Sequence, residues 1–406
     1  MQIAGAVLIE GARGCGKTET GREHSHSEVL FDTDANARAL AEVAPQALLA
    51  GAAPRLLDEW QLVPDLWNHV RREVDERRQP GQFILTGSAT PSDESLRHSG
   101  AARILRLRMR PLSLWEAGIS SGQVSIGELL AGESLAPQAA RNFVSVSDYS
   151  SVLAKGGWPN MRSLEPEEAQ LLLRSYLDDV ARIDIPRLDG HDRRNVTLVR
   201  RTLTSLARHI ATEASLRSIA RDVGGSGEPP RAETISEYLD LLERVFVIEQ
   251  QPSWSPHLRS RARVRRSAKL HFVDPALAVA GLGASPQSLM NDLNTFGLLF
   301  ESLAVRDLRV YGQRAGASVS HYRDSSDLEV DAIIEAPDGR WLAAEVKLGG
   351  TEKQLESAAA SLVRFRENLD LTRTRPPEAL VVVSVGEYAF TRLDGVLVVP
   401  LAMLGP

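Results

Sequence analysis

The sequence predicts an α/β fold in three parts: a parallel sheet covered by helices, a helical middle region, and a second α/β unit. Three observations support this prediction. Short apolar runs alternate with helical stretches in the N-terminal part, helical periodicity dominates residues 166–242, and two strands joined by a turn follow a later helix. The length of 406 residues favours two or three domains. We place the domains at 1–111, 112–195, 196–285 and 286–406, with the second serving as a linker or lid.

The composition is that of a soluble protein, with 43% hydrophobic and 25% charged residues. The net charge of -6 excludes a globally basic surface, so any nucleic-acid surface must be local. The single cysteine, Cys15, excludes an internal disulfide framework and fits a reducing compartment. The first residues lack the pattern of a signal peptide, and no apolar run reaches the roughly 18 residues of a membrane helix. We therefore expect a cytoplasmic protein without a membrane partner.

The N-terminal part reads as alternating strands and helices. Residues 5–9 form a short apolar run that leads directly into a glycine-rich turn, as in a buried strand that feeds a helix. Further strands are expected at 29–31, 56–57 and 83–86, and a charged helix at 65–78. This alternation is typical of a parallel sheet.

The glycine-rich turn fits the P-loop motif G-x-x-x-x-G-K-[ST]. Its glycines let backbone N–H groups surround a phosphate chain, and the helix that begins near Lys17 adds its positive end. Lys17 would reach the β- and γ-phosphates of ATP, and the Thr18 hydroxyl would hold Mg²⁺. A purely structural glycine turn is the alternative. The predicted ATP site consists of Gly11, Ala12, Arg13, Gly14, Cys15, Gly16, Lys17 and Thr18.

Two further strand ends carry candidate catalytic residues. Asp58 and Glu59 follow the expected strand at 56–57. The aspartate would hold Mg²⁺ through its water shell, and the glutamate would polarise the attacking water. A solvated loop is the alternative for this pair. After the strand at 83–86, either Thr86 or Ser88 would sense the γ-phosphate.

Arg103 and Cys15 each have a functional and a plain interpretation. An arginine after the sensor strand can reach the phosphate of a neighbouring subunit as an arginine finger, but Arg103 is also one of several cations up to Arg110. Cys15 could make the loop sensitive to oxidation because it lies beside Lys17 at a helix N-terminus. It could equally be a small loop residue.

The middle region has the element order of a winged helix: helix, turn, helix and a two-stranded wing. A basic run in the expected wing could follow a phosphate backbone, or it could only protect an exposed strand edge. Its residues are Arg259, Arg261, Arg263, Arg265, Arg266 and Lys269. Helices are expected at 166–185, 196–213, 216–221 and 232–242, and strands at 245–249 and 270–273.

The C-terminal part carries a strand pair at 328–334 and 341–348, joined by a Pro-Asp-Gly turn and preceded by a helix at 296–308. Alternation along the strands places Asp331 opposite Glu345, with Lys347 on the same face as Glu345. Two carboxylates could hold Mg²⁺ while the lysine orients water, and Glu301 could add a ligand. A salt-bridged face of an ordinary sheet is the alternative.

The motifs together resemble a family of prokaryotic AAA+ ATPases with an uncharacterised C-terminal domain. The matching stretches include AVLIEGARGCGKT, PRLLDEWQ, GQFILTGSA, HSGAARILRLRMRPLSLWE, GGWP, LFESL, EVDAII and AAEVKLG. This resemblance implies a P-loop ATPase domain, a middle with a winged-helix-like element, and a C-terminal domain similar to PD-(D/E)XK nucleases. It also implies that Arg103 is the finger. The segment before the first strand is nearly absent, which leaves the adenine contacts undefined, and Gly100-Ala-Ala-Arg replaces the usual Gly-Ala-Gly-Arg.

We conclude from the sequence that the protein is an ATP- and Mg²⁺-dependent ATPase coupled to DNA or RNA through the winged helix and the nuclease-like domain. The alternative is a regulatory switch in which ATP controls docking of a protein partner and the C-terminal domain is silent. Homo-oligomers or a protein partner are expected in either case.

Overall fold

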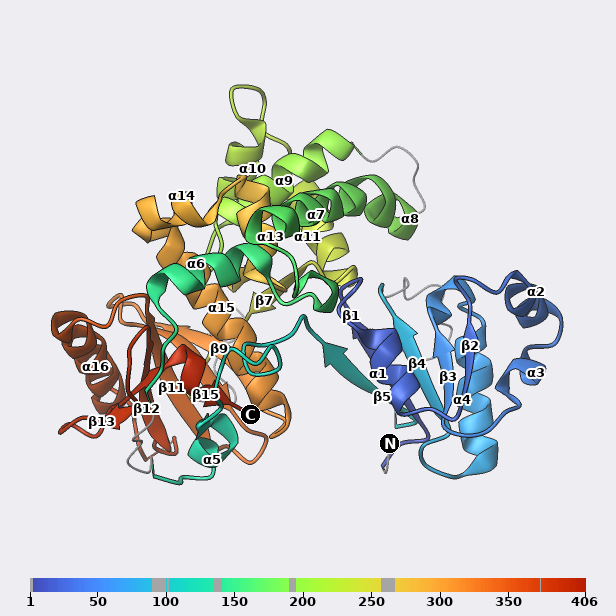
Figure 1. Cartoon of the computed structure of the whole chain (residues 1–406), viewed down its shortest axis with the longest axis horizontal. Helices are drawn as coiled ribbons and strands as arrows, with labels where there is room; N and C mark the ends of the chain where they lie inside the picture. Colours follow the sequence, from blue (N-terminus) through green and yellow to red (C-terminus); the bar gives the residue numbers. More distant parts are fainter. Residues whose placement is uncertain are drawn as a thin grey trace.

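The computed structural model describes residues 3–89, 100, 102–134, 141–189, 195–256, 267–372 and 374–406. Its three parts are arranged as a sheet domain on the right of Figure 1, a helical region at the top, and a second sheet with its helices on the left. The predicted fold class is confirmed: a P-loop-type parallel sheet, a helical middle, and a sheet-rich C-terminal part. Within the described residues, the helices lack the length and apolar composition needed to cross a membrane.

The N-terminal sheet has five parallel strands in the order β2-β3-β4-β1-β5. One face packs Leu8 and Phe31 against α2, α3 and α4, with Trp67 of α4 in the same cluster, and the other packs Ile9 and Ile84 beneath α1. The strands are β1 (Ala6–Gly11), β2 (Ser27–Leu30), β3 (Arg55–Asp58), β4 (Phe83–Gly87) and β5 (Ile104–Met109). The helices are α1 (Lys17–Glu23), α2 (Ala35–Val43), α3 (Pro45–Leu49), η1 (Trp60–Leu62) and α4 (Leu66–Arg77).

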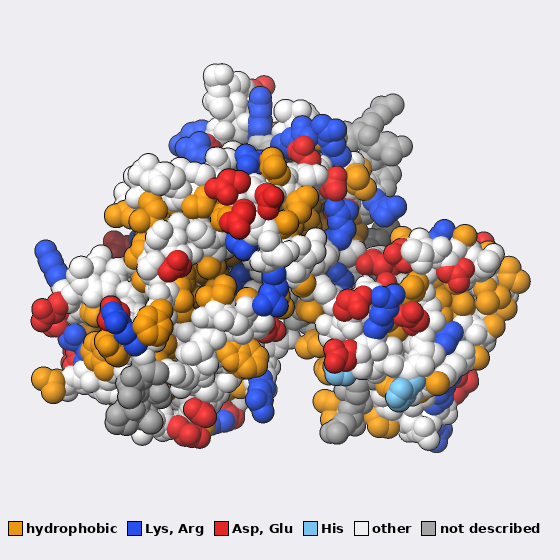
Figure 2. Space-filling view, viewed as in Figure 1, with side chains coloured by type: hydrophobic (Ala, Val, Ile, Leu, Met, Phe, Trp, Pro, Cys, Tyr) orange, Lys and Arg blue, Asp and Glu red, His pale blue; other side chains and the backbone are white. Residues whose placement is uncertain are grey.

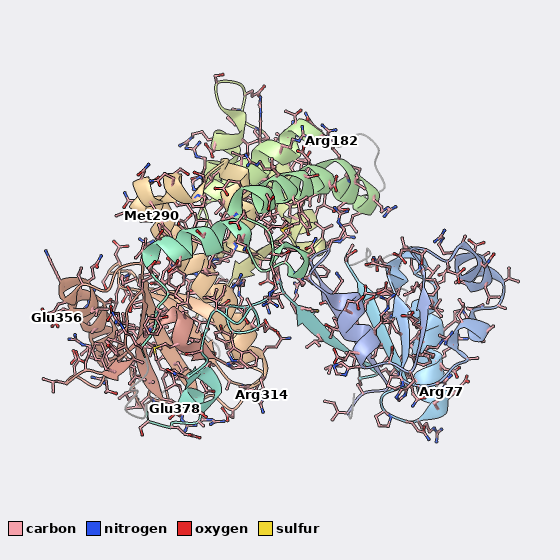
Figure 3. The ribbon with its side chains drawn as sticks, in the orientation of Figure 1. Arg77, Arg182, Met290, Arg314, Glu356 and Glu378 are labelled. Atoms are coloured by element: carbon pink, nitrogen blue, oxygen red, sulfur yellow. The ribbon has the colours of Figure 1, made fainter. Side chains whose placement is uncertain are left out.

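The direction of these strands positions the nucleotide site. The chain begins at the lower edge of the sheet in Figure 1, and Arg77, at the end of α4, also lies at that lower edge in Figure 3. All five strands are parallel, so their carboxyl ends point toward the middle helices. Ligands of open α/β sheets bind outside this end of the strands.

The middle region contains the predicted order of three helices and an antiparallel strand pair, β7 with β8. Its first long helix differs from the prediction, because α7 passes into a π-helical turn before α8. The elements are β6 (Val124–Ser125), α5 (Ile126–Leu130), α6 (Val146–Lys155), η2 (Pro159–Met161), α7 (Pro166–Asp179), the π-helical segment η3 (Val180–Asp184), α8 (Ile185–Asp189), α9 (Val196–Arg208), α10 (Leu216–Gly224), α11 (Ala232–Arg244), β7 (Ile248–Gln251), β8 (Lys269–Phe272), α13 (Pro275–Leu282) and α14 (Pro286–Asn291).

The C-terminal part is a six-stranded sheet in the order β13-β14-β12-β11-β10-β9. Ala332 pairs with Ala344 in the antiparallel β10–β11 ladder, which is the predicted hairpin register. The long helix α15 packs on one face and α16 on the other. The elements are α15 (Leu293–Gln313), β9 (Ser318–Arg323), β10 (Glu329–Glu335), β11 (Trp341–Lys347), α16 (Glu352–Glu367), β12 (Ala379–Ser384), β13 (Phe390–Thr391), β14 (Leu397–Pro400), η4 (Leu401–Met403) and β15 (Leu404–Gly405).

The middle and C-terminal parts share one hydrophobic core. A single cluster of buried side chains spans residues 114–404, takes in Ala12 of the P-loop, and includes residues of α7, α9, α13 and α15. The short strand β6 also pairs with β15 at the other end of the chain. Residues on both sides of the predicted domain borders at 195 and 285 contribute to this core. The middle and C-terminal parts therefore pack together as one body beside the N-terminal sheet.

Candidate nucleotide site and carboxylate cluster

The P-loop connects β1 to α1 in a conformation that requires glycine. Gly14 and Gly16 have φ values of 75° and 105°, in the left-handed region that side chains disfavour. At Gly11, a Cβ atom would lie 2.0 Å from the carbonyl oxygen of Met109. Lys17 is 4% exposed, and its Nζ donates to the carbonyl oxygens of Gly11 (3.0 Å) and Ala12 (2.8 Å). The ammonium group is therefore held inside the loop.

Three of the predicted residues meet at the ends of β3 and β4. The Thr18 hydroxyl donates to Asp58 Oδ1 at 2.9 Å, and the Thr86 hydroxyl donates to the same oxygen. Thr86 Oγ1 also accepts the backbone N–H of Glu59 at 3.2 Å. Asp58 is 3% exposed, so these hydroxyls satisfy a carboxylate that would otherwise be buried without donors. A hydroxyl beside a carboxylate is a donor set that suits Mg²⁺.

Glu59 has a strained backbone, with a positive φ of 54°. Non-glycine residues in this region are uncommon and often lie at functional sites. Its Oε2 accepts from the Ser88 hydroxyl at 3.1 Å and from the Gln61 amide. The structure therefore brings Ser88 to Glu59 and Thr86 to Asp58. The sequence analysis did not identify Gln61 as a site residue. Its position two residues after Glu59 was the one signal that could have indicated it.

The middle region covers the P-loop. Trp158, in the Gly-Gly-Trp-Pro stretch, donates its indole N–H to the carbonyl oxygen of Arg13 at 3.1 Å. The Arg13 guanidinium in turn pairs with Asp179 at 3.0 Å and Asp184 at 3.3 Å. Cys15 is fully buried, and burial raises the pKa of its thiol despite the nearby Lys17. A higher pKa leaves less reactive thiolate, which favours the plain interpretation of this cysteine.

Arg103 lies away from the P-loop of its own chain. Its carbonyl oxygen accepts the N–H of Ala6 at the start of β1, whereas the P-loop follows Gly11 at the other end of that strand. Five residues of strand separate the two ends by about 16 Å. The Arg103 side chain is 38% exposed, and its Nε donates to Asp75 at 2.8 Å. A role for Arg103 as a finger thus requires the site of a second subunit.

The predicted carboxylates of the C-terminal sheet do converge. Asp331 Oδ2 accepts the backbone N–H of Val346 at 2.8 Å, and Lys347 Nζ lies 2.9 Å from Glu345 and 3.9 Å from Asp331. Burial, followed by repulsion from Asp331, raises the pKa of both Glu345 and Glu301 to about 8. The buried cluster therefore disfavours the simultaneous ionisation of all its carboxyl groups.

Lys269 enters this cluster from β8, which the sequence analysis did not foresee. Its Nζ lies 2.7 Å from Glu301, 2.8 Å from Glu329 and 3.5 Å from Asp331, and its side chain is 3% exposed. Burial favours the neutral amine, but the three carboxylates outweigh it and raise the Lys269 pKa. The expectation that Lys269 follows a phosphate backbone is wrong, because its charge is already paired inside the protein. The other members of the basic run, Arg259, Arg261, Arg263, Arg265 and Arg266, lie outside the described residues.

Within the described ranges, no three His, Cys, Asp or Glu side chains are arranged to hold a metal ion. The cluster of Glu301, Asp331 and Glu345 is instead balanced by the ammonium groups of Lys269 and Lys347. The metal-binding role of these carboxylates stays a prediction, and Lys269 is the residue that a metal ion would have to displace.

Comparison with known families finds matches in three ranges of the chain. Residues 4–118 match a family model described as an AAA domain. Residues 146–288 and 296–404 match two domains of unknown function, DUF8612 and DUF4143. Uncharacterised proteins of Mycobacterium bovis and Mycobacterium tuberculosis are each 27% identical over 401 residues, which is 98% of this chain and 80% of theirs.

Two solved structures show a distant likeness. A Walker-type ATPase of Pyrococcus abyssi has a TM-score of 0.39 at 13% identity, covering 68% of this chain and 91% of that one. The Orc1 protein of Aeropyrum pernix in complex with DNA has a TM-score of 0.25 at 13% identity, covering 68% and 86%. The AAA match and the P-loop geometry agree that the N-terminal part has the fold of a P-loop ATPase domain.

Proposed function

We propose that this protein hydrolyses ATP with Mg²⁺ at the P-loop and couples this activity to nucleic acid. ATP hydrolysis with Mg²⁺ is supported by the contact of Thr18 and Thr86 with one oxygen of Asp58, beside the buried Lys17. Lys17 would leave its two carbonyl acceptors for the phosphates, and Thr18 with Asp58 would hold Mg²⁺, which supplies charge stabilisation at the phosphates. Glu59 would polarise water, with its carboxylate oriented by Ser88.

The coupling to nucleic acid is supported by basic side chains of the middle region. Figure 2 shows Lys and Arg side chains along the top of the molecule, where α9 and α10 lie. The exposed arginines of these helices include Arg201 on α9 and Arg217 and Arg221 on α10. In contrast, α11 would be the recognition helix in the predicted winged-helix order, but it exposes Glu233 and Glu237, which would repel phosphates. We therefore assign the contact to α9 and α10.

An ATPase assay with purified chain tests this function. We expect Lys17→Ala to lose tight ATP binding, because the lysine is the main point charge on the phosphates. Glu59→Gln should bind ATP and fail to hydrolyse it. Adding single- or double-stranded DNA or RNA should raise the parental turnover. Parental rates in both variants would refute the site assignment, and turnover that is indifferent to every nucleic acid would refute the coupling.

A second function, the regulatory switch with a silent C-terminal domain, is favoured by Lys269. An internal ammonium among Glu301, Glu329 and Asp331 stabilises the carboxylate cluster without a metal ion. A protein of this kind would turn over ATP without stimulation by DNA or RNA and would leave both intact in the presence of Mn²⁺. Stimulation by nucleic acid separates the two functions.

A further inference from the structure

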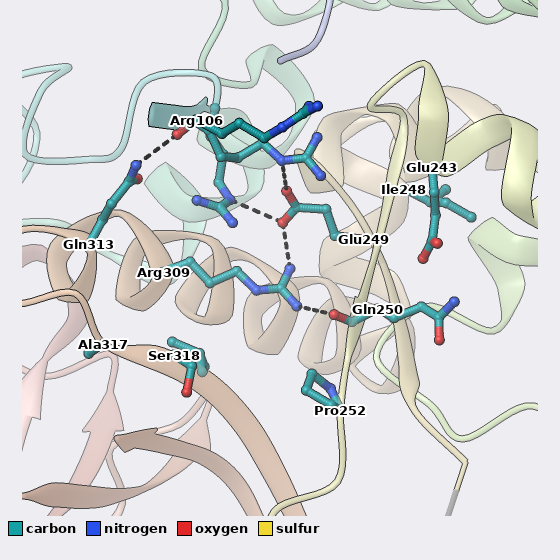
Figure 4. A pocket seen from close by; sticks show the side chains of 13 residues that line it. Arg106, Glu243, Ile248, Glu249, Gln250, Pro252, Arg309, Gln313, Ala317 and Ser318 are labelled. Carbon is teal, nitrogen blue, oxygen red and sulfur yellow. Dashed lines mark hydrogen bonds and ion pairs between the residues drawn. The ribbon is translucent and has the colours of Figure 1, made fainter. Parts of the chain in front are cut away.

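A cavity of about 580 Å³ lies where the N-terminal sheet meets the other two parts of the molecule. Its lining comes from the edge strand β5, from α11 and β7 of the middle region, and from α15 and β9 of the C-terminal part (Figure 4). Four arginines line it: Arg106, Arg108, Arg110 and Arg309. Its lining residues include none of the P-loop residues 11–18.

The cations of the cavity outnumber the carboxylate they share. Glu249 is 7% exposed and lies 3.0 Å from Arg110, 2.9 Å from Arg309 and 3.6 Å from Arg108. These three guanidinium groups outweigh the effect of burial and lower the pKa of Glu249 to about 2. Burial, together with repulsion from Arg110 and Arg108, lowers the pKa of Arg309 to about 10. Three of the arginines therefore crowd around Glu249, while Glu243 also lines the cavity and Arg106 pairs with Glu10 at 2.9 Å.

One donor of Arg108 is unpaired within the part of the chain that the structure describes. Its Nη1 is buried and has no hydrogen-bond acceptor among the described residues. The guanidinium lies 4.2 Å from the centre of the Phe246 ring, which fixes its plane. An unsatisfied buried donor costs about 1–3 kcal/mol. An anionic oxygen in the cavity would satisfy this donor and offset the repulsion among the arginines.

The arrangement of the cations indicates a chain of phosphates. Arg106, Arg108 and Arg110 alternate along the edge of the N-terminal sheet, so they share one face at intervals of about 7 Å. Arg309 continues this row onto α15. The guanidinium groups of Arg108, Arg110 and Arg309 converge on Glu249 in this structure. Their separate attachment points would let them spread along a backbone with one charge per repeat once an anion displaces that carboxylate.

The same elements connect the cavity to the carboxylate cluster. On α15, Arg309 and Glu301 are eight residues apart, which corresponds to about 12 Å along the helix. On β7, Glu249 contacts the arginines, and Gln251 donates its side-chain amide to the carbonyl oxygen of Asp331 at 2.8 Å. A polymer held at the arginines would thus lie beside the carboxylates.

We propose that this cavity binds the phosphodiester backbone of a nucleic-acid strand, with Arg108 as its principal donor and Arg106, Arg110 and Arg309 beside it. Guanidinium groups suit this role because they are weakly hydrated and can donate two parallel hydrogen bonds to a phosphate. The proposal deepens the proposed function and rests on its nucleic-acid partner. The alternative is a network of ion pairs that only joins the three parts.

The test measures binding of a fluorescent single-stranded oligonucleotide to the full chain across a series of salt concentrations, without ATP. Arg108→Gln should weaken binding about tenfold, as expected for a lost charge-assisted hydrogen bond. It should also reduce the slope of log affinity against log salt by about 0.7, the value for one phosphate contact on a single strand. Arg108→Lys should retain the parental slope because it keeps the charge. Arg323→Gln, an exposed arginine of β9, is the matched control and should bind as the parent does.

The outcomes separate this site from the proposed function. If the parental chain binds the strand and Arg108→Gln binds equally well, the cavity proposal is overturned and the coupling stands. If the parental chain binds no strand, the cavity proposal and the coupling to nucleic acid are both overturned. ATP turnover in the same preparation then shows separately whether the chain hydrolyses ATP. Binding of pyrophosphate to a chain that also carries Lys17→Ala distinguishes a small phosphate compound from a nucleic-acid strand as the ligand. If Arg108→Gln removes pyrophosphate binding but spares the strand, the ligand is a small phosphate compound and the proposal is wrong.

Discussion

Arg13 of the P-loop forms an ion pair with Asp184 of the middle region, with 3.3 Å between Nη1 and Oδ1. Asp184 ends the π-helical segment Val180–Asp184, and π-helical turns often mark functional sites. Burial raises the pKa of Asp184, and the Arg13 charge opposes this effect. The loop that would hold the phosphates is thus connected directly to the helices outside the ATPase domain.

We predict that Arg13→Ala uncouples the middle region from the nucleotide. The variant should still bind ATP within a few-fold of the parental affinity, because Lys17 and the loop backbone remain. Hydrogen exchange of residues 176–189 should respond to ATP in the parental chain and lose that response in the variant. Arg22→Ala removes an exposed arginine of α1 that pairs with Glu19 and Glu28, and it should behave as the parent does. An undiminished response in Arg13→Ala would contradict the coupling.

Thr86 and Ser88 should differ in their effects on catalysis. Thr86→Val removes the hydroxyl that donates to Asp58 and accepts from the Glu59 backbone, so we expect kcat to fall about 10- to 100-fold. Ser88→Ala leaves Asp58 untouched and removes one of the two donors to Glu59 Oε2, where the Gln61 amide remains, so its effect should be smaller. Turnover at a range of Mg²⁺ concentrations checks this, since only Thr86→Val should raise the Mg²⁺ requirement. Equal losses in the two variants would contradict this division of roles.

Arg103 should act only between subunits, because it lies at the opposite end of β1 from its own P-loop. Specific activity should then rise with protein concentration. Mixing Lys17→Ala with Arg103→Ala should restore activity, since each variant repairs a different half of a shared site. Asp75→Asn, which releases Arg103 from its present partner, should not reduce activity. No recovery in a mixture that demonstrably co-assembles would exclude the role in trans.

The sequence was most informative where function requires a dense local pattern. The P-loop could be predicted because glycine, lysine and threonine must occur at fixed spacing between a strand and a helix. Asp331 and Glu345 could be placed opposite each other because strand alternation and a short turn determine the register. The borders of most helices shifted by a few residues, as expected when packing rather than propensity decides where a helix ends.

Lys269 could not be predicted because its role depends on packing between distant segments. In the sequence it adjoins five arginines and reads as one more exposed cation. Only the approach of β8 to α15 and β10 encloses it among carboxylates. The same holds for β6, whose partner β15 lies at the other end of the chain. Contacts of such long range leave no periodic signal in the sequence.

Lys269 should limit metal binding at the carboxylate cluster. The test compares two chains, both with the nucleotide site disabled by Asp58→Ala, of which one also carries Lys269→Ala. Mn²⁺ should raise the melting temperature of the chain with Lys269→Ala by about 2 °C or more beyond the rise in the other chain. The reason is that the vacated carboxylates repel one another until a cation binds. Lys353→Ala on the exposed face of α16 is the control. Equal shifts would mean that Lys269 does not compete with metal.

A separate experiment tests whether the carboxylate cluster still cuts nucleic acid. DNA fragments that appear with Mn²⁺ and disappear in Lys347→Ala would indicate retained cleavage.

Glu249 should make the junction between the three parts sensitive to acid. Its pKa is about 2 in the folded chain and has an ordinary value of 4.5. The unfolded chain therefore takes up this proton first, so the stabilisation is present above about pH 4.5 and is lost as the pH falls toward 2. The shift corresponds to about 3 kcal/mol. The groups that face Glu249 are Arg108, Arg110, Arg309 and the carboxyl of Glu243, whose own pKa is raised by burial.

Urea unfolding between pH 5 and pH 2.5 checks this contribution. The midpoint of the parental chain should fall more steeply with acid than that of Glu249→Gln, which has no proton to gain at this position. Glu249→Gln should also be less stable at pH 5, because it leaves three buried guanidinium groups without their carboxylate. Glu367→Gln, at an exposed position of α16, should keep the parental slope. Parallel slopes in the parental chain and Glu249→Gln would show that this carboxylate does not control the acid response, and that the arginines are held together by other contacts.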